Sequence, residues 1–121
     1  MAAYQDFEIG ESLAEQTYNA VEKSKDVATG TNEVTKAIER NEADLVVIAG
    51  NVSPEEIVMH LPALSDERDI AYTFVPDREE LGLAAGINVQ SAAVAITNPG
   101  SASDDVDDIA EKSRELREAE E

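Results

Sequence analysis

Three short apolar runs separate the polar segments of this chain. They cover residues 44–49, 71–75 and 92–97. The first has no polar side chain between Asp44 and Gly50, which is typical of a strand buried on both faces. Helical patterns lie before, between and after these runs. Strands that alternate with helices predict an α/β fold, here a three-layer α/β/α sandwich.

The expected helices begin where capping residues precede a 3.6-residue apolar period. They cover residues 12–24, 31–40, 53–61, 77–86 and 103–121. Ser12-x-x-Glu15 and Ser53-x-x-Glu56 have the spacing of capping boxes. Pro62 predicts a break, and Gly82 or Gly86 is expected to end the fourth helix. The apolar stripe of the last helix is Val106, Ile109, Ala110 and Leu116. Without a repeat or linker, we expect one domain over residues 1–121.

Composition limits the class of protein. Hydrophobic residues make up 42% of the 121 residues but aromatic ones only 4%, so we expect a core of Val, Ile, Leu and Ala. The absence of cysteine excludes disulfides and thiolate metal sites. No apolar run approaches the roughly 20 residues of a membrane span. Residues 1–10 lack the features of a signal peptide. These observations favour a cytoplasmic protein with no membrane contact. We expect the protein to be monomeric when free.

The net charge of −18 argues against nucleic acid, because such a field repels phosphates. It is also the charge expected of a protein from a salt-rich, halophile-like cytoplasm, or of a module that docks basic partners. Six acids fall in residues 1–29, twelve in residues 30–102 and nine in residues 103–121. Because the acid is spread along the whole chain, the halophile interpretation is favoured.

The second predicted helix has one polar stripe. At 100° per residue, the side chains of Asn32, Glu33, Lys36 and Arg40 fall within a roughly 100° arc. Its opposite side is apolar and consists of Val34, Ala37 and Ile38. Between Asp26 and Glu67, Lys36 and Arg40 are the only Lys or Arg residues. Two cations on one stripe of so acidic a chain indicate a negatively charged partner.

Nucleic acid fits the chemistry of this stripe. Gly30 permits close backbone approach, and a helix start offers N–H groups to phosphate. Asn32 can donate to and accept from a base edge, Glu33 can accept from a base amino group, and Lys36 and Arg40 can reach phosphates. A purely structural alternative stays open. In it, Thr31 or Asn32 caps the helix, Glu33 complements the dipole, and the two cations form ion pairs along the helix.

An enzyme is not expected. His60 is the only histidine and is predicted to be a packed helical residue. Asp104-Asp105 and Asp107-Asp108 lack the spacing of an EF-hand and indicate a solvated helix start. The sequence shows no histidine cluster and no glycine-rich phosphate loop, and it indicates neither a metal nor a cofactor.

Several separated motifs, in one order and spacing, resemble the archaeal large-subunit ribosomal protein family that binds kink-turn RNA. The resemblance covers roughly residues 10–98. Its motifs are Gly30–Arg40, Leu45–Ala49, Pro54–Pro62, Leu81–Gly86 and Ser91–Ile96. The family implies a four-stranded mixed sheet between helices. It also implies a role in the ribosome and, in archaea, in box C/D and box H/ACA guide-RNA particles and in RNase P, which processes tRNA. Other proteins of these ribonucleoprotein particles are implied partners.

The resemblance also implies roles for individual residues. Asn32 and Glu33 correspond to the pair that reads guanine edges in the kink-turn, and Lys36 to a lysine on backbone or bases. Arg78 corresponds to a basic residue before the short fourth helix. Ile87, Asn88 and Val89 correspond to the loop that packs on the extruded nucleotide. Together with Gly30, Thr31 and Arg40 these residues form the predicted RNA-binding set.

The chain departs from the family at three positions. Ala28 and Thr29 stand where lysines are usual, and Leu83 stands where a basic or polar residue is usual. These departures remove phosphate contacts but keep the residues that act at short range, by hydrogen bonding or apolar packing, namely Asn32, Glu33, Ile87 and Val89. Screening at molar salt mutes long-range charge, so hydrogen bonds and packing then carry the affinity. The alternative function is an acidic interaction module that binds basic proteins through residues 103–121.

Overall fold

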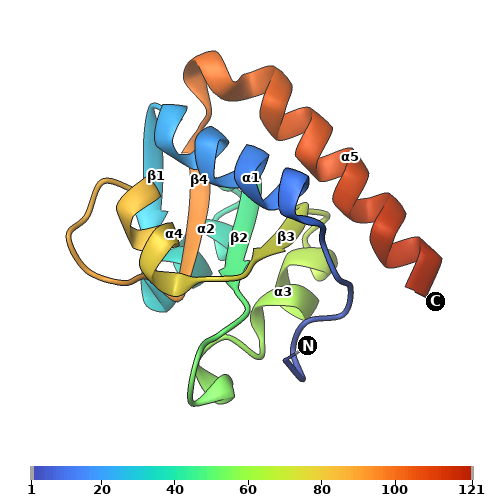
Figure 1. The fold of residues 1–121 in the computed structure, drawn as a ribbon. Helices are drawn as coiled ribbons and strands as arrows, with labels where there is room; N and C mark the ends of the chain where they lie inside the picture. Colours follow the sequence, from blue (N-terminus) through green and yellow to red (C-terminus); the bar gives the residue numbers. More distant parts are fainter. Residues whose placement is uncertain (1, 121) are drawn as a thin grey trace.

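A four-stranded mixed sheet runs through the middle of the molecule in the computed structural model, which describes residues 2–120 (Figure 1). Its strands are β1 (Asp26–Thr29), β2 (Leu45–Ala49), β3 (Tyr72–Val75) and β4 (Ala93–Asn98). They lie in the order β1-β4-β2-β3. β2 is parallel to β3, and β4 is antiparallel to both of its neighbours. The mixed sheet expected from the family resemblance is confirmed.

Helices cover both faces of this sheet. The five α-helices are α1 (Glu11–Lys23), α2 (Thr31–Glu39), α3 (Leu61–Glu67), α4 (Arg78–Ala84) and α5 (Ser103–Glu120). Figure 1 shows α1, α4 and α5 in front of the sheet and α2 behind it. α3 packs on α2 and β3. The α/β/α class predicted from the alternation of helices and strands is therefore confirmed. Within residues 2–120, no helix combines the length and apolar character needed to cross a membrane.

The core consists mainly of aliphatic residues, as the composition predicts. All five residues of β2 are buried, as are Val94, Ala95 and Ile96 of β4. Aromatic rings are few but gathered. Phe7 lies 5.1 Å from Phe74 and 6.0 Å from Tyr72 between ring centroids, and Tyr4 lies 6.4 Å from Phe74. These rings attach the N-terminal segment to the edge strand β3, an arrangement that composition does not reveal.

A helix was expected from residue 53 to about residue 61 or beyond, with a break at Pro62, and a continuous helix over 53–61 is wrong. The chain instead forms a short 3-10 turn, η1 (Glu55–Ile57), and α3 begins at Leu61. Pro54 has an extended backbone and lies outside the turn. Pro62 lies in the first turn of α3, which is where a proline is tolerated. A helix running through residue 62 would place the proline ring against the carbonyl of residue 58, so the helix begins anew there.

Two further expectations need correction. Ser12 makes no capping hydrogen bond, because α1 begins one residue earlier, at Glu11. β1 does not appear among the strands expected from apolar runs. It has only four residues, and Asp26 and Ala28 have low strand propensity, so pairing with β4 decides its conformation. The α5 stripe is mostly as predicted: Val106 and Ile109 are buried, Ala110 and Leu116 are half-buried, and Ser113 is also buried.

Candidate nucleic-acid interface

One edge of the sheet gathers the segments that the sequence marks as functional. β1, β2 and β3 end at this edge and β4 begins there, because Thr29 pairs with Val94, Ile48 with Ala93, and Ala49 with Val75. The Gly30 N–H donates to the Ala93 carbonyl at 3.0 Å. The start of α2, the segment after β2, the start of α4 and the loop 86–92 therefore share one edge.

The start of α2 leaves backbone donors free. Gly30 precedes the helix with φ +86, and no side chain caps it. The first helical hydrogen bond runs from Val34 N–H to the Gly30 carbonyl, at 2.9 Å. Within residues 2–120, the backbone N–H groups of residues 31–33 have no hydrogen-bond partner. Capping by Thr31 or Asn32 is thus ruled out, and the helix start presents a positive dipole end and free donors to an anion.

The polar stripe on α2 faces solvent as predicted. Asn32, Glu33 and Lys36 are exposed, whereas Val34, Ala37 and Ile38 are buried against the sheet. Lys36 Nζ lies 3.3 Å from Glu33 Oε1, and the two side chains remain 53% and 60% exposed. The ion pair of the structural alternative therefore exists. Such an exposed pair is worth well under about 1 kcal/mol, so a ligand can open it at little cost.

Arg40 lies apart from the rest of this set. It is the residue after the last turn of α2, about 12 Å along the helix axis from Asn32. That position is at the end of α2 away from the shared edge. Thr31 is half-buried, and its hydroxyl oxygen is buried with no hydrogen-bond partner among residues 2–120. Of the predicted α2 residues, Gly30, Asn32, Glu33 and Lys36 are the ones presented near the edge.

Asn51 fixes the start of α4, a role that the sequence patterns did not indicate. Its Oδ1 accepts from the Arg78 backbone N–H at 2.9 Å, and its Nδ2 donates to Asp77 Oδ1 at 3.3 Å. Asp77 in turn caps α4 by accepting from the Glu79 N–H at 2.9 Å. Arg78, half-buried, is thereby held at the shared edge. The available signal was the position of Asn51, directly after a buried strand and Gly50.

The loop after α4 begins with a glycine turn. Gly86 has φ +82, its N–H donates to the Leu83 carbonyl, and the Ile87 N–H donates to the Gly82 carbonyl at 3.1 Å. These two bonds form a Schellman motif, the helix end expected at Gly86. Ile87 is half-buried and Asn88 is exposed. Val89 is 68% exposed, which is unusual for a large apolar side chain.

His60 is not the packed residue that the sequence suggested. It is exposed and directly precedes α3. Its Nε2 lies 3.0 Å from Thr35 Oγ1, and that hydroxyl donates to the Thr31 carbonyl at 2.8 Å. The Thr35 oxygen therefore accepts from His60 Nε2–H. This contact joins the start of α3 to the solvent side of α2.

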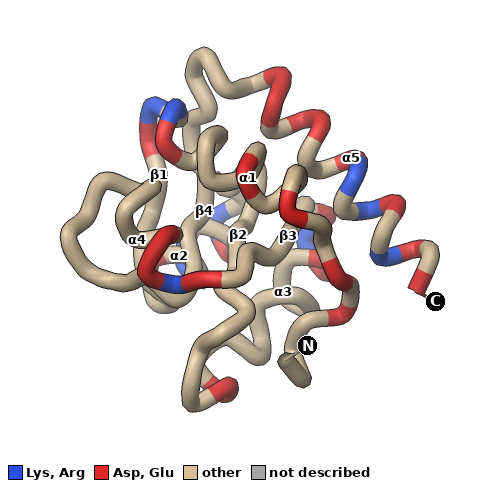
Figure 2. The backbone as a smooth tube through the Cα atoms, in the orientation of Figure 1, with Lys and Arg blue, Asp and Glu red and all other residues tan. Residues whose placement is uncertain are grey.

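At the acidic start of α5, Asp104 and Asp107 are exposed as predicted, whereas Asp108 is engaged within the protein. Lys112 Nζ contacts Asp108 Oδ2 at 2.8 Å, and Gln16 Nε2 donates to the same oxygen at 2.9 Å. These hydrogen bonds lower the pKa of Asp108. Residues 2–120 contain no group of three or more side chains arranged to hold a metal ion. Figure 2 shows acidic residues on every layer of the fold, in keeping with their spread along the sequence.

Comparison with known proteins defines the family. Residues 12–106 match the Ribosomal protein L7Ae/L30e/S12e/Gadd45 family. The large ribosomal subunit protein eL8 of Haloquadratum walsbyi is 52% identical over 120 residues, covering 97% of this chain and all of that protein. Among solved structures, a Giardia lamblia 15.5kD RNA binding protein superimposes with a TM-score of 0.82 and 28% identity, covering 89% of this chain and 92% of that one.

The chain therefore belongs to the Ribosomal protein L7Ae/L30e/S12e/Gadd45 family. This confirms the resemblance drawn from the separated sequence motifs. Because the family is one of ribosomal proteins, the expectation that the chain is not an enzyme is also confirmed.

Proposed function

We propose that this protein binds kink-turn RNA in the large ribosomal subunit, with the start of α2 and the loop 86–92 as its contact surface. The observation that carries the proposal is the uncapped start of α2, where exposed Asn32 and Glu33 stand beside free backbone N–H groups. Amide and carboxylate groups can read unstacked purine edges, while N–H groups and Lys36 meet phosphates. Family membership and the eL8 relative support a ribosomal RNA partner.

Each element of the shared edge has a role in this proposal. Arg78 supplies a second phosphate contact, and Val89 with Ile87 packs on bases turned out of the helix. Asn88 donates or accepts beside them. Lys36 exchanges its exposed ion pair with Glu33 for contacts to the RNA. Arg40, at the far end of α2, serves only RNA that extends along the helix.

The first experiment tests the α2 contact. A short RNA containing a kink-turn is titrated with the wild-type protein, with Asn32→Ala and with Lys36→Ala, and binding is measured by electrophoretic mobility shift. Loss of base-edge hydrogen bonds at Asn32 should weaken binding by about tenfold or more. Asn19→Ala, an exposed change on α1, is the matched control and should bind as wild type does. Unchanged affinity of Asn32→Ala and Lys36→Ala would favour the acidic interaction module instead.

The RNA partners in the cell are proposed more broadly. Guide RNAs of box C/D and box H/ACA particles and RNase P RNA contain the same type of bend that the family resemblance implies. We further propose a cytoplasmic protein adapted to high salt, for which the net charge of −18 and the Haloquadratum relative are the support. Sequencing the RNA that copurifies with the protein tests these roles. Recovery of ribosomal RNA alone would remove the guide-RNA and RNase P assignments.

A further inference from the structure

Two adjoining hollows lie along the flank of α1, on the sheet face away from α2. Their volumes are about 700 Å³ and about 600 Å³, and Tyr18 and Glu80 line both. The larger hollow lies between α1, the N-terminal segment and the turn after β3. The smaller one lies between α1, β1 and α4. Tyr18 and Glu80 lie where the two hollows meet, and the Tyr18 hydroxyl accepts from the Asp77 N–H at 3.0 Å, so it reaches from α1 to the start of α4 at this point. The two adjoining hollows are together called the α1 groove.

The larger hollow is uniformly acidic. Its charged lining consists of Glu8, Glu11, Glu15 and Glu80, with no Lys or Arg. All four side chains are exposed, and none forms an ion pair with any of residues 2–120. Its floor includes Ile9, Ala14 and Val75. Figure 2 shows the acidic positions of α1, of the chain leading into it and of α4 in the front layer of the fold.

The smaller hollow has a mixed lining. Its apolar residues are Val21, Val27, Leu83, Ala84 and Ala85, and its charged residues are Glu22, Lys25 and Glu80. Leu83 is 68% exposed, although leucine is usually buried. The same position is one at which this chain departs from the basic or polar residue usual in its family. A single exposed leucine is common on protein surfaces. Leu83 offers an apolar contact to a partner because it lines this hollow together with Glu80.

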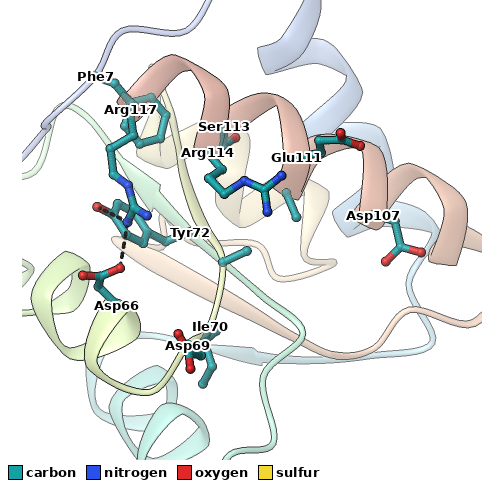
Figure 3. Close-up of a pocket in the computed structure, with 12 residues that line it drawn as sticks. Phe7, Asp66, Asp69, Ile70, Tyr72, Asp107, Glu111, Ser113, Arg114 and Arg117 are labelled. Carbon is teal, nitrogen blue, oxygen red and sulfur yellow. Dashed lines mark hydrogen bonds and ion pairs between the residues drawn. The ribbon is translucent and has the colours of Figure 1, made fainter. Parts of the chain in front are cut away.

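The groove between α3 and α5 differs from the α1 groove because its charged side chains are partly paired within the protein (Figure 3). Its volume is about 490 Å³, and its walls carry Arg114 and Arg117 as well as acidic residues. Arg117 already pairs with Asp66 at 3.0 Å and lies over the Tyr72 ring at 5.3 Å from the centroid. Charge in that groove is partly satisfied within the protein, whereas the carboxylates beside α1 are left to solvent.

We propose that the α1 groove binds an extended, Lys- or Arg-rich segment of another protein, with an apolar residue of that segment packed on Leu83. The four unpaired carboxylates complement the basic side chains, and Tyr18 at the junction offers a ring beside them. The same carboxylates repel RNA phosphates from the larger hollow, whereas the smaller hollow borders the proposed RNA surface at Gly86. That the partner belongs to the same ribonucleoprotein particle rests on the proposed function.

The test uses the full-length protein without RNA and a fluorescein-labelled synthetic peptide. The peptide carries one leucine followed by four lysines, one for each glutamate, and glycines separate these residues. Fluorescence anisotropy measures binding at low salt. Replacing Glu8, Glu11, Glu15 and Glu80 together by Gln should weaken binding about tenfold. Leu83→Ser should weaken it about fivefold through lost apolar contact.

A matched control separates the groove from general charge. The combined variant Asp107→Asn, Glu111→Gln, Glu115→Gln and Glu120→Gln removes the same number of charges from exposed positions of α5. It should bind the peptide within about twofold of wild type. Urea unfolding checks that every variant is folded. A second peptide with serine in place of leucine should bind the wild-type protein more weakly than the leucine peptide does. The two peptides should bind Leu83→Ser equally.

Four outcomes would overturn the proposal. The first is that the peptide does not bind the wild-type protein. The second and third are that peptide affinity falls equally in the groove and α5 variants, or in the α5 variant alone. The fourth is that the leucine and serine peptides bind the wild-type protein equally. The second outcome would assign the interaction to long-range charge, and the third would assign it to the α5 side. A parallel titration with kink-turn RNA keeps the two proposals apart. If wild-type protein fails to bind RNA but binds the peptide through the groove, the proposed function fails and the groove stands.

Discussion

The α carbon of Gly82 lies directly beneath the carbonyl of Val89, so that a Cβ at position 82 would stand 2.0 Å from that oxygen. Gly82 is buried inside α4, where glycine is otherwise unfavourable. The glycine lets the loop 86–92 fold back on the helix, and the Ser91 N–H bond to the Arg78 carbonyl, at 3.0 Å, holds it there. Ile87, Asn88 and Val89 take their positions from this contact.

Gly82→Ala should therefore disturb both stability and RNA binding. The added methyl meets backbone, which cannot give way without moving the loop, so we expect a loss of at least about 2 kcal/mol in the free energy of unfolding. Kink-turn affinity should fall as well, because the loop moves. Gly10→Ala is the control, since a Cβ there meets nothing within 4 Å. Urea denaturation measures the free energy of unfolding, and RNA titration measures the affinity. Wild-type values of both would contradict the role given to Gly82.

The salt dependence of RNA binding should be unusual. At 1 M salt the Debye length is about 3 Å, so the repulsion from distant acids is muted while contacts at Asn32 and Val89 persist. Kink-turn affinity should therefore hold or rise as KCl increases toward molar concentration. Filter binding over a KCl series measures this directly. A steep, monotonic loss would instead show that phosphate neutralisation dominates, as in ordinary RNA-binding proteins.

Truncation after Glu111 should lower stability but spare RNA binding. It removes the buried Ser113 hydroxyl, which donates to Thr73 Oγ1 at 2.8 Å, the half-buried Leu116, and Arg117 over the Tyr72 ring. Their summed contribution is about 2–4 kcal/mol. Chemical denaturation gives the loss, and RNA titration under conditions in which the truncated protein is folded gives the affinity. Because α5 lies away from the shared edge, an equal loss of RNA affinity would contradict the proposed surface.

Stability should decline between pH 10 and pH 12. Burial, more than any charge, raises the pKa of Tyr18 and of Tyr72 to about 12 from the usual 10. The unfolded chain ionises these phenols from about pH 10, whereas the folded protein keeps them neutral until about pH 12. The stabilisation is thus fully present below pH 10 and is lost as pH rises toward 12. Tyr72→Phe, followed by urea denaturation across this range, should show a shallower decline. A slope equal to that of wild type would mean that Tyr72 takes no part.

Much of the fold follows from local sequence patterns. The apolar run 44–49 specifies the central strand, and the 3.6-residue period of 31–40 separates buried Val34, Ala37 and Ile38 from exposed Asn32, Glu33 and Lys36. These predictions succeed because each depends on which face of a single element meets the core. Where a nonlocal contact decides the conformation, as in the pairing of β1 with β4, the local pattern was silent.

By itself, the sequence determined the class of fold, the polar stripe of α2 and the family. Tertiary structure alone decided that α2, Asn51, Arg78 and the loop 86–92 meet at one edge, and that Arg40 does not. It also decided that carboxylates from the N-terminal segment, α1 and α4 line a single groove. The physical reason is that periodicity records the environment of each residue within its own element. Which elements become neighbours depends on strand pairing and packing between distant segments.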